Sequence, residues 1–119
     1  MTVQRNRLDR MVQELDPEFV RELLDMFISE FPQLLSNLQR SFREGDAKHV
    51  FLYAHTLKGS SRQFGLEDLG NVFEELEQMG NQNALQGGES MLAHVGEMYS
   101  EAKRLLTNFV DSLLISDAA

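Results

Sequence analysis

Residues 47–64 read AKHVFLYAHTLKGSSRQF, and the spacing of the apolar residues in this segment indicates the class of structure. At about 100° of rotation per residue, a helix would gather one set of side chains between roughly 160° and 240° from His55. That set is Val50, Tyr53, Leu57, Ser61 and Phe64. The segment therefore predicts an amphipathic helix that buries this side and leaves His55 in solvent.

The rest of the chain shows the same helical spacing, and no convincing alternation of apolar and polar residues suggests a strand. We expect helices over residues 3–14, 17–44, 47–64, 67–80 and 89–115. Pro32 falls inside the second helix and should kink it rather than end it, because the apolar spacing continues on both sides. The predicted fold is all-α: an antiparallel four-helix bundle with an additional short N-terminal helix across one end.

Capping residues mark the boundaries of these helices. Asp16 and Asp46 are typical of N-caps, since their carboxylates can accept the free N–H groups of a first turn. Glycine follows three of the helical patterns and should end each helix, at Gly45, Gly65 and Gly80. After Gly80, the run NQNALQGG predicts a loop.

Composition limits the classes of protein to consider. The 119 residues suffice for one domain, 1–119, and the 42% of hydrophobic residues is ordinary for a globular protein. A net charge of −8 argues against nucleic acid and anionic membranes as partners, and no apolar run of about 18 residues occurs. There is no cysteine, and the polar N-terminus lacks the apolar stretch of a signal peptide, so we expect a cytoplasmic protein.

The neighbours of His55 on the outer face suggest a contact surface. Phe51 and Leu52 lie near −40° and 60° from His55, about one helical turn away, and paired apolar residues around an exposed histidine favour docking. Gly59 lies near 40°, also on the outer face, where close packing between helices does not explain a glycine that costs about 1 kcal/mol relative to alanine. We expect Gly59 to give clearance to an approaching partner.

Two basic residues extend the same face. Lys58 is three residues after His55, and its ammonium group could offset the negative charge of a phosphoryl group on the ring. Arg62 lies near −20° from His55 and would enlarge the surface for a partner. A nucleophile, a nearby cation and a gap for close approach together suit a histidine that accepts a phosphoryl group from another protein.

Several motifs resemble those of the histidine-containing phosphotransfer (HPt) domain of multistep phosphorelays. The resemblance covers nearly the whole chain, and its most specific part is AHTLKGSS at residues 54–61. Supporting segments are LDPEFVRELL at residues 15–24, Gly65-Leu66, Leu69 and Leu76-Glu77.

The resemblance implies a role for individual residues. His55 would be the phosphoacceptor, Lys58 the supporting cation and Gly59 the clearance glycine. Where several family members carry glutamine, this chain has Glu77, which either points away or holds the imidazole N–H before transfer. We assign Glu77, with Phe51, Leu52 and Arg62, to the partner-binding surface.

The resemblance also implies partners and chemistry. His55 would receive its phosphoryl group from a receiver-domain aspartate, or from a histidine kinase, and pass it to another receiver aspartate. The partners would be receiver domains of response regulators, a hybrid sensor histidine kinase, or both, with Mg²⁺ held by the receiver and no cofactor in this chain. We expect a monomer, because self-association through the docking face would block the relay.

Other functions have weaker support in the sequence. No glycine-rich phosphate-binding motif occurs, so we expect a phosphocarrier rather than an ATP-dependent enzyme. The Glu-x-x-His motif of di-iron bundles is absent, so we expect no metal site and interpret His49 and His94 as helix-surface residues. The remaining alternatives are a non-catalytic adaptor that docks receivers or kinases, and a bundle that a kinase phosphorylates directly.

Overall fold

The computed structural model describes residue 3 and residues 5–118. These residues form helices and no strand, which confirms the all-α prediction. The helices are α1 (Arg5–Glu14), α2 (Pro17–Arg43), α3 (Ala47–Gln63), α4 (Glu67–Asn81), α5 (Gly88–Leu92) and α6 (Val95–Ala118). None of them is long and apolar enough to cross a membrane.

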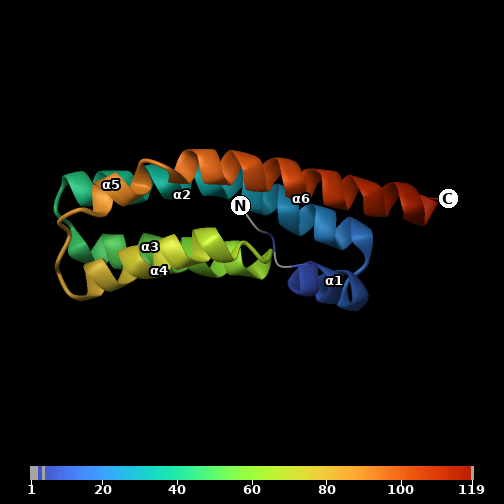
Figure 1. Ribbon diagram of the computed structural model, residues 1–119, viewed down its shortest axis with the longest axis horizontal. Coiled ribbons are helices and arrows are strands. Elements are labelled where there is room, and N and C mark those ends of the chain that lie inside the picture. The colour runs from blue at the N-terminus through green and yellow to red at the C-terminus, as the bar shows by residue number, and fades with distance from the viewer. Residues whose placement is uncertain (1–2, 4, 119) are drawn as a thin grey trace.

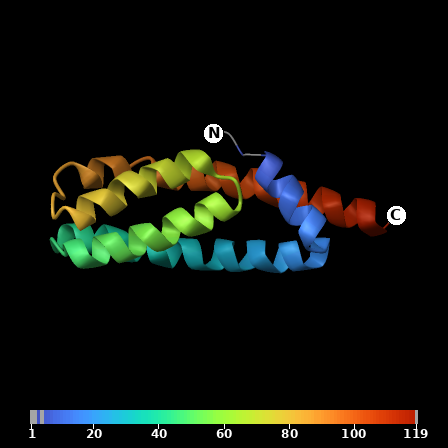
Figure 2. The same ribbon diagram turned by 90° about the horizontal axis from the view of Figure 1, so that it is seen from below.

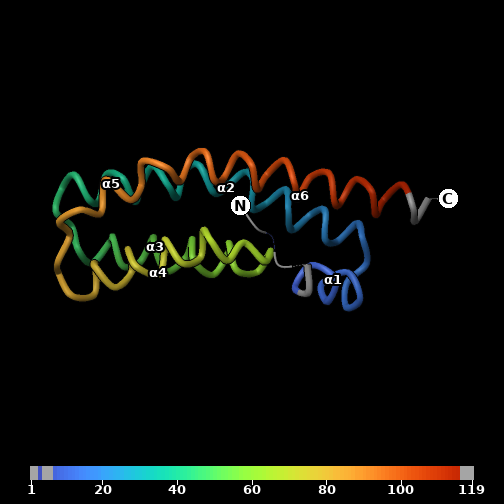
Figure 3. Tube along the Cα trace, in the orientation of Figure 1, coloured from blue at the N-terminus to red at the C-terminus, as the bar shows by residue number. Residues whose placement is uncertain are grey.

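The helices pack in two layers (Figure 1). One layer contains α2 beside α5 and α6, and the other contains the antiparallel pair α3 and α4. Because α2 and α6 extend beyond the ends of α3 and α4, part of their inner surface needs another cover. Figure 2 shows α1 crossing this extension between α2 and α6, at one end of the bundle as predicted. The trace in Figure 3 follows α2 through a tight connection into α3.

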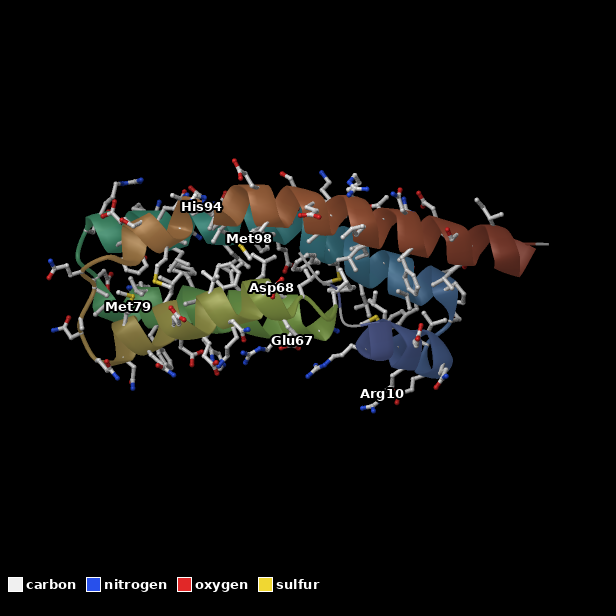
Figure 4. The ribbon with its side chains drawn as sticks, in the orientation of Figure 1. Arg10, Glu67, Asp68, Met79, His94 and Met98 are labelled. Atoms are coloured by element: carbon white, nitrogen blue, oxygen red, sulfur yellow. The ribbon has the colours of Figure 1, made fainter. Side chains whose placement is uncertain are left out.

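Apolar side chains fill the space between the layers, and Met79 of α4 and Met98 of α6 both lie there (Figure 4). Phe31 of α2 occupies the centre and is almost fully buried. Its ring stacks on Tyr99 of α6, with centroids 4.0 Å apart, and meets the edge of Phe73 of α4 at 5.9 Å. Phe31 therefore joins three helices from both layers.

Most of the predicted helix boundaries are confirmed. Asp16 accepts a hydrogen bond from the N–H of Phe19, and Asp46 accepts one from the N–H of His49. Gly45 has a φ of +68° just after α2, a backbone conformation that glycine adopts without strain. Pro32 lies inside a helix that continues on both sides of it.

The predicted helix over residues 89–115 is wrong as a single element. The structure divides it into α5 and α6, with a turn at Ala93 and His94. Leu92 and Val95 are both buried and keep a helical spacing, so the apolar pattern hides the break. Gly96, which lowers helix propensity beside the turn, was the available signal. His94 is therefore exposed in a turn rather than on a helix surface.

Gly80 was also misinterpreted, because it does not end its helix. It lies inside α4, which continues to Asn81. A Cβ atom on Gly80 would lie 2.6 Å from the backbone N of Phe51 and 2.8 Å from the carbonyl O of Ala47. Both of those atoms belong to the backbone of α3, so glycine is needed here for the close approach of α3 and α4.

We predict that Gly80→Ala destabilises the bundle by about 1–3 kcal/mol, because a rigid backbone must move to admit the methyl group. The matched control is Gly59→Ala, which places a methyl group in open space and should gain up to about 1 kcal/mol from helix propensity. Urea unfolding followed by circular dichroism measures both variants. Equal effects of the two substitutions would contradict the packing role of Gly80.

Candidate functional site

α3 presents His55 to solvent, as the helical pattern predicted. The His55 side chain is 63% exposed, while Val50 and Leu57 on the opposite side of α3 are fully buried. The ring of Phe51, one turn earlier, stacks near the imidazole with a centroid separation of 5.9 Å. His55 is therefore accessible to a partner but supported on a well-packed helix.

Glu77 of α4 connects His55 to Lys58. Its Oε2 lies 2.7 Å from Nδ1 of His55, and Lys58 Nζ donates to Oε1 at 3.0 Å. The side chains of Glu77 and Lys58 are only 14% and 19% exposed. Of the two orientations considered for Glu77, the structure supports the one that holds the imidazole N–H.

The carboxylate of Glu77 selects the tautomer of the neutral ring. Burial alone would raise the pKa of Glu77, but hydrogen bonds from Lys58 and His55 outweigh burial and hold that pKa below its ordinary value of 4.5. The carboxylate is thus ionised near neutral pH and can only accept hydrogen bonds. In the neutral imidazole, Nδ1 of His55 therefore carries the proton and Nε2 the lone pair. Nε2 has no bonding partner within the described part of the chain.

The surface around the ring is open on one side and apolar. Leu52 is 46% exposed, and Phe51 is half-buried. A Cβ atom added to Gly59 would meet nothing within 4 Å, so no neighbouring helix explains this glycine. The structure therefore places Gly59 on open surface one turn from His55, where a side chain would project into solvent.

Arg62 lies apart from the His55 cluster. Its guanidinium donates to Asn71 and Glu74 of α4, at 3.1 and 3.2 Å. A Cβ atom on Gly70 would lie only 2.7 Å from the Arg62 side chain, so Arg62 packs across α4 at that glycine. The contact of Arg62 with a partner stays a prediction.

Sequence analysis missed the partners of Arg62, although the spacing of charged residues on the two helices could have identified them. Lys58 and Arg62 are four residues apart on α3, and Glu74 and Glu77 are three residues apart on α4. On antiparallel helices these spacings match, so that Lys58 meets Glu77 and Arg62 meets Glu74. The described residues include no group of three or more acidic, histidine or cysteine side chains that could hold a metal ion.

Comparison with known proteins identifies the family of the chain. The family model described as "Hpt domain" matches residues 22–108, which include α3 and α4 and most of α2 and α6. The chain belongs to the Hpt domain family. The segment containing His55, Lys58 and Gly59 lies within the matched region, and so does Glu77.

A curated relative of this Hpt domain is the phosphorelay intermediate protein rdeA of Dictyostelium discoideum. It is 32% identical over 96 residues, which are 81% of this chain but 38% of the relative. The chain therefore spans well under half the length of that protein. No solved structure gave a significant match. The family and this relative support a phosphotransfer intermediate as the general class of the chain.

We predict that the stabilising effect of Glu77 depends on pH. Because folding lowers the pKa of Glu77, its contribution is present above the unfolded value of about 4.5 and is lost as pH falls through the folded value. Glu77→Gln should therefore cost about 1–2 kcal/mol at pH 7, and less as pH falls below about 4.5. Urea unfolding between pH 3 and 8 tests this, with Glu75→Gln, an exposed residue of α4, as the control. A cost independent of pH would contradict it.

Proposed function

We propose that this Hpt domain is a phosphocarrier of a multistep phosphorelay. Nε2 of His55 accepts a phosphoryl group from an aspartyl phosphate of a receiver domain and passes it to the aspartate of another receiver. The observation that carries the proposal is an exposed imidazole whose Nδ1 is held by an ionised, mostly buried carboxylate, which makes Nε2 the nucleophile.

The electron and proton balance of the transfer is simple. The Nε2 lone pair forms a bond to phosphorus while the phosphorus–oxygen bond to the aspartate breaks, and its electron pair leaves with the carboxylate. The proton stays on Nδ1, bonded to Glu77, so the phosphorylated ring carries positive charge. The transition state of such transfers is loose, and what this chain supplies is chiefly position and charge compensation.

Lys58 supplies part of that compensation. Its Nζ is bonded to the same carboxylate as the imidazole, so the ammonium is held beside the ring before any phosphoryl group arrives. Lys58 would then offset the negative charge of the phosphoryl oxygens. We assign Mg²⁺ to the receiver domain.

The docking surface would be the apolar outer face of α3. Leu52 is exposed near His55, Phe51 supports the ring, and Gly59 leaves room for the rim of a receiver active site. The partners in this proposal are receiver domains of response regulators, a hybrid sensor histidine kinase, or both. The carrier would act as a cytoplasmic monomer with this face free.

The central experiment is phosphoryl transfer from a phosphorylated receiver domain in the presence of Mg²⁺. Intact-mass and peptide mass spectrometry at neutral to basic pH should locate one phosphoryl group on His55. His55→Gln should abolish it. His49→Gln is the matched control, because His49 is an exposed histidine on the same helix and should not be needed.

Three results would contradict the proposal. Phosphate on His49 or His94 would show that His55 is not the acceptor. A folded protein that binds receivers but acquires no phosphate from several of them would favour an adaptor, and labelling by a kinase core without any receiver would favour a direct kinase substrate.

A second prediction tests the docking surface. Leu52→Ala should slow transfer from a receiver several-fold, while changing the free energy of unfolding by less than about 0.5 kcal/mol because the residue is exposed. Ile115→Ala removes a comparable exposed side chain from the far part of α6 and should leave transfer unchanged. Equal transfer rates for the two variants would show that Leu52 is outside the interface.

A further inference from the structure

The negative charge of Glu77 has a consequence beyond fixing the tautomer of His55. A glutamine at this position could accept the same N–H from Nδ1 through its amide oxygen. That glutamine would also avoid the repulsion between a carboxylate and an incoming phosphoryl group. The carboxylate therefore acts differently from an amide chiefly in the phosphorylated state, where the charge of the ring changes.

We propose, on the basis of the proposed function, that Glu77 is a positioning residue that keeps phospho-His55 short-lived and readily transferred near neutral pH. Its carboxylate holds the proton on Nδ1 after Nε2 has been phosphorylated. The phosphorylated ring is then a cation bonded to an anion at the distance seen here between Nδ1 and Oε2, 2.7 Å.

The proton on Nδ1 decides how easily the nitrogen–phosphorus bond breaks. When that bond breaks, its electron pair returns to Nε2. If Nδ1 is protonated, the leaving group is a neutral imidazole. If Nδ1 has lost its proton, the leaving group is an imidazolate anion, which leaves far less readily. A group that keeps Nδ1 protonated to higher pH therefore keeps the phosphoryl group transferable.

The pairing of Lys58 with Glu77 also shortens the lifetime of phospho-His55. In the resting state its ammonium lies 3.0 Å from each carboxylate oxygen of Glu77. A phosphoryl group on Nε2 would compete with Glu77 for this cation, so Lys58 stabilises phospho-His55 less than a free lysine would. Replacing Glu77 with a neutral residue would release Lys58 to the phosphoryl oxygens.

Other charged groups near the ring are few. From α3 the charged neighbour is Lys58, and from α4 it is Glu77. Arg62 and Glu74, one turn along, are paired with each other. Within the described ranges, no charged side chain of α2 is hydrogen-bonded or ion-paired to His55. Substitution of Glu77 should therefore change the charge environment of the ring more than any other substitution on α4.

The test uses a small phosphoryl donor, so that no partner is needed. Wild type and Glu77→Gln are phosphorylated with phosphoramidate, freed of reagent, and followed by ³¹P NMR and mass spectrometry from pH 5 to 9. We expect the half-life of phospho-His55 at pH 7.5 to be about fivefold or more longer in Glu77→Gln. The pH at which phospho-His55 becomes long-lived should fall by about one unit or more, since an ion pair at this distance favours the charged ring by that order.

Two controls make the result specific. Glu75→Gln changes the charge of the protein equally but lies on the exposed side of α4, and it should behave as wild type. In a Lys58→Met background, Glu77→Gln should still shift the pH profile, because the ring proton depends on the carboxylate itself. Loss of the shift in that background, or identical half-lives and pH profiles for wild type and Glu77→Gln, would overturn the inference.

Failure of this inference is distinguishable from failure of the proposed function. If receivers phosphorylate His55 but Glu77→Gln has the half-life and pH profile of wild type, only the role of Glu77 is wrong. If phosphoramidate labels His55 and Glu77→Gln shifts its lifetime, but no receiver or kinase transfers phosphate to it, the chemistry of the site stands and the relay role fails.

Discussion

The close approach of α3 and α4 is the constraint on which the site depends. At Gly80 the backbone of α4 lies against the backbone of α3, with no room for a Cβ atom. Glu77 is three residues before Gly80, so it projects from nearly the same side of α4. A short carboxylate can then reach both His55 and Lys58 within hydrogen-bonding distance. With a larger residue at position 80, the helices would separate and Glu77 would reach neither partner well.

Charge pairs set the register of the same two helices. Lys58 with Glu77, and Arg62 with Glu74, form two successive contacts along the antiparallel pair. Exposed ion pairs contribute little to stability, but a helix that slid by one turn would leave two mostly buried charged groups without partners. The Lys58–Glu77 pair is mostly buried, so it specifies the alignment that places a carboxylate opposite His55.

The sequence predicted the fold and the exposed histidine because both depend on apolar periodicity, which α2 and α3 show clearly. It could not distinguish the roles of its glycines. Gly59 faces open space and Gly80 faces a backbone, yet both are single glycines within helical patterns. Likewise the break between α5 and α6 left no trace in the apolar spacing, because Leu92 and Val95 remain on the buried side. The orientation of Glu77 depended on the distance between two helices, which no local pattern contains.

Under the proposed function, the electrostatic state of the site suits a phosphoryl group that is passed on rather than stored. At rest the cation of Lys58 and the anion of Glu77 balance each other beside the imidazole. A phosphoryl group would add negative charge to a domain whose net charge is already −8, with one nearby ammonium that is shared with a carboxylate. A deeper phosphate site would surround the group with unpaired guanidinium and ammonium groups, whereas Arg62 is committed to α4 here. Weak compensation of the phosphoryl charge raises the free energy of the phosphorylated state. A phosphocarrier needs that free energy in order to transfer the phosphoryl group to its next acceptor.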